Sequence, residues 1–174
     1  MKRMQHSWGR YAVRVLAASV AALLLAGCAS ADGKREVRRE SFPYWEKGAG
    51  ASQAVKFMRV QVPKGAVEVK GAVRVQPQER VYLLSFLTDE KAAEAVADDL
   101  RPEHPLEAKN FSSSLSDDGF AHLDLDLPHE IPDVRSTSVC PPCVGDKRRS
   151  HIQGIEMHIE DRADGRARVY LTAY

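Results

Sequence analysis

Two cysteines separated by a pair of prolines, Cys140 and Cys143, are the residues whose type and spacing most clearly suggest chemistry. Thiol oxidoreductases use a Cys-x-x-Cys pair, and positive charge nearby lowers the pKa of the reactive thiol. Lys147, Arg148 and Arg149 follow the pair closely enough to have this effect. The same pair would also suit a disulfide that stiffens a loop, so two interpretations are open at this point.

The sequence around the pair favours the structural interpretation. A thioredoxin-type pair follows a strand and opens a helix, but Gly145 and a charged, polar run follow Cys143 here. All nine prolines precede Cys143, so none can supply the cis-proline that the thioredoxin family places beside its pair from later in the chain. The basic trio is then best explained as a solvated loop surface.

A zinc site is a third interpretation, because Cys140 and Cys143 with His151 and His158 would supply four ligands of the types that zinc prefers. Seven residues separate Cys143 from His151, and six separate the two histidines. This spacing matches no common zinc template. His158 also alternates with apolar neighbours in a strand pattern, which predicts that its side chain points to solvent. We therefore predict no metal site.

Other chemical signals are weak. Asp117, Asp118, Asp124 and Asp126 lack the spacing and the closing glutamate of an EF-hand loop, and the outer face of a short strand explains them more simply. The His-Glu pair at 129–130 is not followed by the second histidine of a zinc protease. The sequence also holds no Gly-x-Ser-x-Gly nucleophile elbow and no phosphate-binding glycine fingerprint. We therefore expect no enzyme activity and no cofactor.

The first 27 residues have the layout of an export signal. A cationic start precedes an apolar run from Val15 to Ala26. A bilayer span needs about 20 apolar residues, whereas this run has 12, so it fits the core of a signal peptide. The run ends in Leu25-Ala26-Gly27-Cys28, which resembles the lipobox of bacterial lipoproteins.

This resemblance implies cleavage before Cys28 and a diacylglycerol on its sulfur. Two acyl chains, at about 0.8 kcal/mol per buried methylene, hold a protein stably on a membrane. Residues 28–43 would then be the lipidated N-terminus and a flexible tether, and residues 44–174 a single domain. Outside the cytoplasm, Cys140 and Cys143 are expected to form a disulfide.

The charge of the mature chain argues against nucleic acid as a partner. The signal peptide holds four of the 25 basic residues and none of the 24 acidic residues, so the mature chain has a net charge of −3. A nucleic-acid binder would carry a basic face.

The spacing of apolar residues predicts an α+β domain with an antiparallel sheet of five or six strands and one helix packed on a face. A helix follows Thr88, which can cap it, and ends at Pro102. Asp164-Gly165 is a turn typical of a closing hairpin. We expect core packing for Tyr44 and Trp45, and an irregular segment over 128–142. Strands are predicted at 57–62, 67–76, 81–87, 121–127, 153–159 and 169–173.

The mature chain, from Val62-Pro63-Lys64-Gly65-Ala66 through Cys140-Pro-Pro-Cys143, resembles small uncharacterised lipoproteins of high-GC Gram-positive bacteria. The resemblance implies no known activity and therefore no site residues. We predict a membrane-anchored extracytoplasmic module that binds an envelope protein or a small molecule and is not an enzyme. The alternative is an extracytoplasmic thiol-redox protein that uses Cys140 and Cys143.

Overall fold

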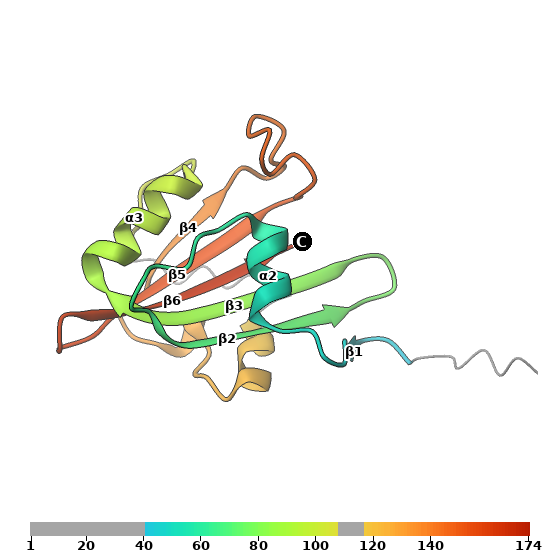
Figure 1. Cartoon of the computed structure of the whole chain (residues 1–174), viewed down its shortest axis with the longest axis horizontal. Helices are drawn as coiled ribbons and strands as arrows, with labels where there is room; N and C mark the ends of the chain where they lie inside the picture. The colour runs from blue at the N-terminus through green and yellow to red at the C-terminus, as the bar shows by residue number, and fades with distance from the viewer. Residues whose placement is uncertain (1–40, 108–116) are drawn as a thin grey trace, which may run out of the picture. The chain divides into compact units, whose positions relative to one another are not determined.

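Six strands form one open, antiparallel sheet in the order β1-β2-β3-β6-β5-β4 (Figure 1). The computed structural model describes residues 41–107 and 117–174, so Cys28, the predicted signal peptide, the predicted tether up to residue 40 and residues 108–116 lie outside the described part. The strands are β1 (Tyr44–Trp45), β2 (Val67–Val75), β3 (Arg80–Asp89), β4 (Arg135–Val139), β5 (Ile155–Asp161) and β6 (Arg166–Ala173). The predicted α+β class is confirmed, and of the five or six strands expected the sheet has six.

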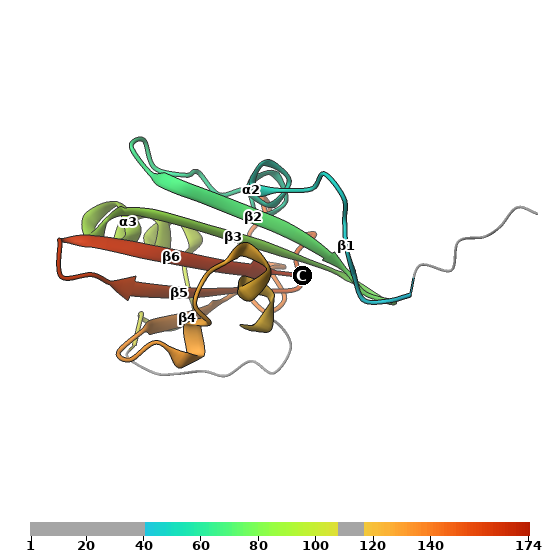
Figure 2. The same cartoon turned by 90° about the horizontal axis from the view of Figure 1, so that it is seen from below.

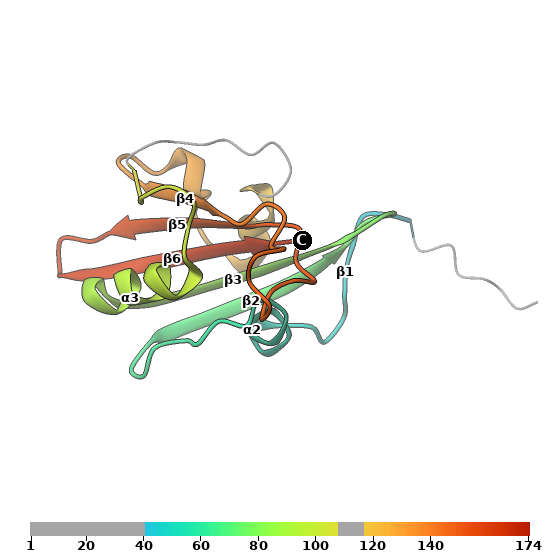
Figure 3. The same ribbon diagram turned by 90° about the horizontal axis from the view of Figure 1, so that it is seen from above.

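Two α-helices, rather than the one expected, cover the same face of this sheet (Figures 1 and 3). They are α2 (Ala51–Met58) and α3 (Glu90–Leu100). The predicted strand at 57–62 is wrong, because Ala54 and Met58 lie one helical turn apart and both are buried. No helix within residues 41–107 or 117–174 is both long and apolar enough to span a bilayer.

The main hydrophobic core lies between these helices and the sheet. Leu84 and Phe86 of β3 and Leu171 of β6 are fully buried there. β3 and β6 are buried along almost their whole length, on both faces of the sheet, and β5 is buried at most positions. The continuous apolar run over 81–87 therefore correctly predicted a central strand.

The opposite face of the sheet is covered by a segment containing two 3-10 helices, η1 (Asp117–Leu123) and η2 (Pro128–Glu130) (Figure 2). Phe120 packs against Tyr170 of β6 beneath this segment, with ring centroids 5.1 Å apart. The strand predicted at 121–127 is therefore wrong. Its alternating leucines pack on the second core from a 3-10 turn and the coil after it.

β4 was expected to be irregular, because its sequence Arg-Ser-Thr-Ser-Val gives almost no apolar signal. It forms because β5 pairs with it along its whole length, from Arg135 opposite Ile159 to Val139 opposite Ile155. The closing hairpin between β5 and β6 is confirmed, and Gly165 adopts the positive φ of 74° in its turn.

Candidate functional site

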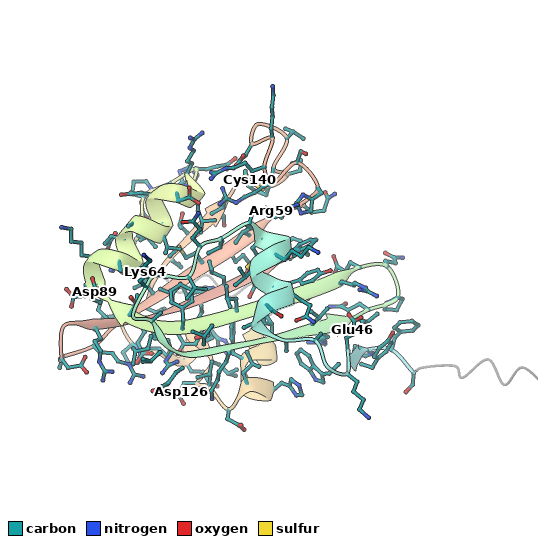
Figure 4. All side chains as sticks on the ribbon, in the orientation of Figure 1. Glu46, Arg59, Lys64, Asp89, Asp126 and Cys140 are labelled. Atoms are coloured by element: carbon teal, nitrogen blue, oxygen red, sulfur yellow. A yellow bond between two sulfur atoms is a disulfide. The ribbon has the colours of Figure 1, made fainter. Side chains whose placement is uncertain are left out.

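A groove of about 420 Å³ lies beside α2, on the face of the sheet that the helices cover. We call it the α2 groove. In Figure 4, Arg59 lies at the C-terminal end of α2, and Glu46 lies close to β1. The residues that line the groove are Glu46, Lys47, Gly48, Ala49, Gln53, Lys56, Phe57, Arg59, Val73, Arg80, Tyr82 and His151.

Three aromatic side chains meet in the α2 groove. Phe57 of α2 stacks on Tyr82 of β3, with ring centroids 3.8 Å apart and an angle of 8° between the planes. His151 meets the Phe57 ring nearly at right angles, with the centroids 5.1 Å apart. The pleat of β3 turns Tyr82 toward the helices. A half-buried stack of this kind offers apolar, polarizable surface to a ligand.

Positive charge surrounds these rings. Lys47, Lys56 and Arg59 are exposed, and within the described residues none of the three forms an ion pair or a side-chain hydrogen bond. Glu46 is engaged with Arg80 at 3.2 Å. The groove therefore holds four cationic side chains and one carboxylate.

His151 is held at the rim by a hydrogen bond between its Nε2 atom and the carbonyl oxygen of Phe57, at 3.0 Å. A carbonyl oxygen can only accept, so Nε2 carries the proton and donates it. In the neutral ring, the Nδ1 atom is therefore the acceptor. This bond ties the loop that carries His151 to the last turn of α2.

Arg149 also joins the loop that carries His151 to the C-terminal end of α2. Its side chain is fully buried. The Nε atom donates to the carbonyl oxygen of Met58 at 3.0 Å, and Nη2 donates to that of Arg59 at 3.1 Å. The remaining donors reach the carboxylates of Asp99 and Asp146, each at 2.8 Å. The expectation of a solvated basic trio is wrong for Arg149, because it satisfies the carbonyls at the end of α2.

The carboxylates of Asp99 and Asp146, which bind Arg149, have pKa values below the usual value for aspartate. Burial opposes the ionised form of Asp99, but hydrogen bonds from Arg148 and Arg149 hold the pKa of this carboxyl below its usual value. Arg148 is about half exposed and pairs with Asp99 at 2.9 Å. Arg148 and Arg149 thus have a structural role in pairing with these carboxylates.

The Cys140 and Cys143 sulfurs lie 2.10 Å apart, at disulfide distance. Cys143 is fully buried in the main core, and a turn rather than a helix follows it. Cys140, labelled in Figure 4, and His151 both lie in the segment between β4 and β5. The pair is thus close in sequence to the groove but does not line it.

The zinc interpretation finds no support in the described residues, where no group of three or more histidine, cysteine or acidic side chains is placed to hold a metal. His151 bonds to a backbone carbonyl. His158 lies on the other side of the sheet from Cys143, because it is paired with Tyr170 of the second core. Its predicted solvent exposure is also wrong, since only 3% of its surface is accessible.

Two other hollows in the described part of the chain have fewer of the features expected of a ligand site. A second groove of about 690 Å³ runs between α3 and the segment after α2, and no aromatic side chain lines it. A third hollow contains Trp45, whose ring stacks on His122 with centroids 4.0 Å apart. Trp45 also packs against the second core, as expected.

No local sequence pattern predicts the α2 groove. Phe57 was assigned to a strand, Tyr82 to a buried strand, and His151 was considered only as a metal ligand. Only tertiary contacts bring Phe57, Tyr82 and His151 together. No local spacing of residues predicts such contacts. A comparison of the chain with protein-family models, curated proteins and solved structures finds no match.

Proposed function

We propose that this protein is a lipid-anchored extracytoplasmic binding module that takes a small-molecule ligand in the α2 groove. The observation that carries the proposal is the convergence of a stacked aromatic pair with unpaired cations in a single groove. Ligand sites are commonly concave, with volumes of roughly 300–1,000 Å³ and apolar or aromatic walls beside a few polar groups. The α2 groove has these properties.

The contacts of the groove residues favour binding over catalysis. A general base needs a proton to abstract within hydrogen-bond reach, and a nucleophile needs such a base beside it. His151 instead donates to the Phe57 carbonyl, and Glu46 pairs with Arg80. The residues that line the groove include no serine, threonine or cysteine that the free Nδ1 atom of His151 could activate, which favours ligand binding over nucleophilic catalysis.

The location follows from the N-terminal sequence. The lipobox resemblance at Leu25–Cys28 supports acylation of Cys28, and the polar residues up to 43 support a tether between the lipid and the domain. A flexible tether of fifteen residues has a root-mean-square reach of about 20 Å. A binding domain on such a tether would sample ligands near the membrane surface.

The binding part is tested by methyl NMR of the full chain in phosphatidylcholine nanodiscs, titrated with a collection of small organic fragments. We expect saturable shifts of the Ala49 and Val73 methyl groups, which line the α2 groove. The methyl groups of Val62 and Ala95 line the second groove and serve as the internal control. Shifts confined to the second groove, or no saturable shift at all, would overturn the proposal.

The thiol-redox alternative stays a prediction with its own test. A structural disulfide between Cys140 and Cys143 should have a reduction potential below about −300 mV, whereas catalytic pairs lie at less negative values. Equilibration of the full chain with a thiol redox buffer measures this potential. A value in the oxidoreductase range, with turnover lost in Cys140→Ser, would favour the redox function instead.

A further inference from the structure

We propose that the ligand of the α2 groove is a small organic anion that carries a planar ring. The ring would lie against the Phe57–Tyr82 pair, and the anionic group would lie among Lys47, Lys56 and Arg59. This inference rests on the proposed function and specifies the chemistry that the same groove selects.

The need for a ring follows from the groove's aromatic surface. Phe57 and Tyr82 are both half-buried, so each ring is packed on one side and accessible in part. Aromatic pairs gain stabilisation beyond the area that they bury, and the gain requires a stacked or edge-on partner. A planar ligand ring can extend this stack, whereas a saturated ring of similar size can contribute only its buried area.

The need for a negative charge follows from the balance of ionised groups. Of the groove's four cations, Arg80 is offset by Glu46, and Lys47, Lys56 and Arg59 remain without a partner in the described part of the chain. Four cations against one carboxylate leave an excess of three positive charges among the lysine, arginine and glutamate side chains of the groove. A low-dielectric wall of aromatic rings strengthens the attraction of such charges for an anion relative to open solvent.

The position of the cations on the helix adds to this argument. Lys56 and Arg59 are three residues apart, the second of them just beyond the last turn of α2. Arg59 adopts a left-handed conformation with φ of 54°, and its carbonyl is held by Arg149. The backbone that carries the Arg59 side chain is thus fixed, although its guanidinium group has no protein partner.

The second groove provides an internal comparison. It shares Arg59 and also contains Lys64, but Arg148 and Asp99 neutralise each other in it and its lining has no aromatic side chain. A ligand with both a ring and a negative charge should therefore choose the α2 groove. A simple anion would have less reason to discriminate between the two.

Four related probes separate charge from ring. They are 1-naphthoate, the neutral 1-naphthylmethanol, the cationic 1-naphthylmethylammonium, and cyclohexanecarboxylate, an anion without a planar ring. Each is titrated into the full chain in phosphatidylcholine nanodiscs, and binding is measured from the Ala49 and Val73 methyl shifts. We expect 1-naphthoate to bind about tenfold more tightly than the neutral probe and the cationic probe to bind most weakly.

Variants then assign the two halves of the site. Lys56→Gln with Arg59→Asn should weaken 1-naphthoate about tenfold and leave 1-naphthylmethanol unchanged. Asparagine is chosen because it tolerates the left-handed backbone at residue 59. Phe57→Leu should weaken 1-naphthoate and 1-naphthylmethanol several-fold and leave cyclohexanecarboxylate unchanged. Lys91→Gln removes an exposed lysine of α3 outside the groove and is the matched control.

The outcomes distinguish this inference from the proposed function. If no probe or fragment shifts the groove methyl groups, the proposed function fails and this inference fails with it. If neutral or cationic probes bind in the groove as tightly as 1-naphthoate, the proposed function stands and the anionic ligand is overturned. If cyclohexanecarboxylate binds as tightly as 1-naphthoate, the planar ring is overturned.

Discussion

At the scale of single residues, the buried Arg149 is expected to contribute strongly to stability. Arg149→Ala should lower the free energy of unfolding by at least about 2 kcal/mol, because it leaves two backbone carbonyls without their donor and removes one of the two arginines that bind Asp99 and Asp146. Urea denaturation followed by circular dichroism measures the loss. Arg148→Ala, at the half-exposed neighbour, is the control and should change the midpoint far less.

His158 is the residue that should couple stability to pH. Burial lowers the pKa of its imidazole below 6.5; the carboxylate of Glu156 opposes this shift and His129 adds to it. The folded state therefore binds fewer protons at this position than the unfolded chain. By linkage, the His158 contribution is unchanged above pH 6.5 and the free energy of unfolding falls as pH drops below that value.

The pH effect of His158 is isolated by a variant that cannot titrate. His158→Phe keeps a ring in the buried position and should flatten the fall in stability between pH 6.5 and pH 5, measured by thermal unfolding at several pH values. His104→Phe, at an exposed histidine, is the matched control and should leave the slope unchanged. An identical slope in the wild-type and His158→Phe proteins would contradict the assignment.

At the scale of elements, Gly71 determines how closely α2 approaches the sheet. A Cβ atom at this position of β2 would lie 2.6 Å from the Cα of Ala51 and 2.8 Å from the carbonyl oxygen of Leu83. Both are backbone atoms, so Gly71→Ala must displace the start of α2. We expect a loss of about 1–3 kcal/mol in unfolding free energy and shifted resonances of the groove residues.

The matched control for this packing prediction is Gly145→Ala. A Cβ atom at Gly145 meets no atom within 4 Å, so this variant should unfold like the wild type. Heat-induced unfolding of both variants gives the comparison. If Gly71→Ala were as stable as Gly145→Ala and kept the wild-type groove spectrum, the close approach of α2 to β2 would be disproved.

The elements differ in how much of them could be predicted from the sequence. β3 was predictable from its continuous apolar run, and the β5–β6 hairpin from its apolar alternation and the Asp164-Gly165 turn, because all of these are local signals. The start of α3 was predicted within one residue, but Asp89 rather than Thr88 caps it, accepting from the Ala92 amide at 2.9 Å. β4 could not be predicted, since its pairing with β5 supplies what its own polar sequence lacks.

The α2 groove could not be predicted from the sequence either, because it is formed by contacts between segments that are distant in the chain. Phe57, Tyr82 and His151 belong to a helix, a strand and a loop, and only packing makes them neighbours. Arg149 shows the principle most clearly. Its charge and its place in a basic run predict solvent exposure, yet the carbonyls at the end of α2 and two carboxylates compensate its burial completely.

At the scale of the whole molecule, the two faces of the sheet are specialised. The helix-covered face carries the larger core, the Cys140–Cys143 loop and the α2 groove. The opposite face holds a smaller core and a polar group in which the Tyr170 hydroxyl donates to Glu160 at 3.1 Å. Burial, followed by the nearby Glu160 charge, raises the pKa of that hydroxyl, so Tyr170 stays protonated. The proposed ligand site therefore lies on the face that carries the larger core.

The membrane attachment is the prediction that concerns the chain as a whole. Cys28→Ala removes the only sulfur in the lipobox-like segment, so we expect this variant to carry no acyl chains. The variant should then either appear in the soluble fraction or keep its uncleaved signal peptide. The physical reason is that each buried methylene contributes about 0.8 kcal/mol to membrane binding. Ser30→Ala, two residues away, should remain in the membrane. Intact mass spectrometry checks acylation directly. Unchanged membrane retention of Cys28→Ala would show that something other than lipid holds the domain there.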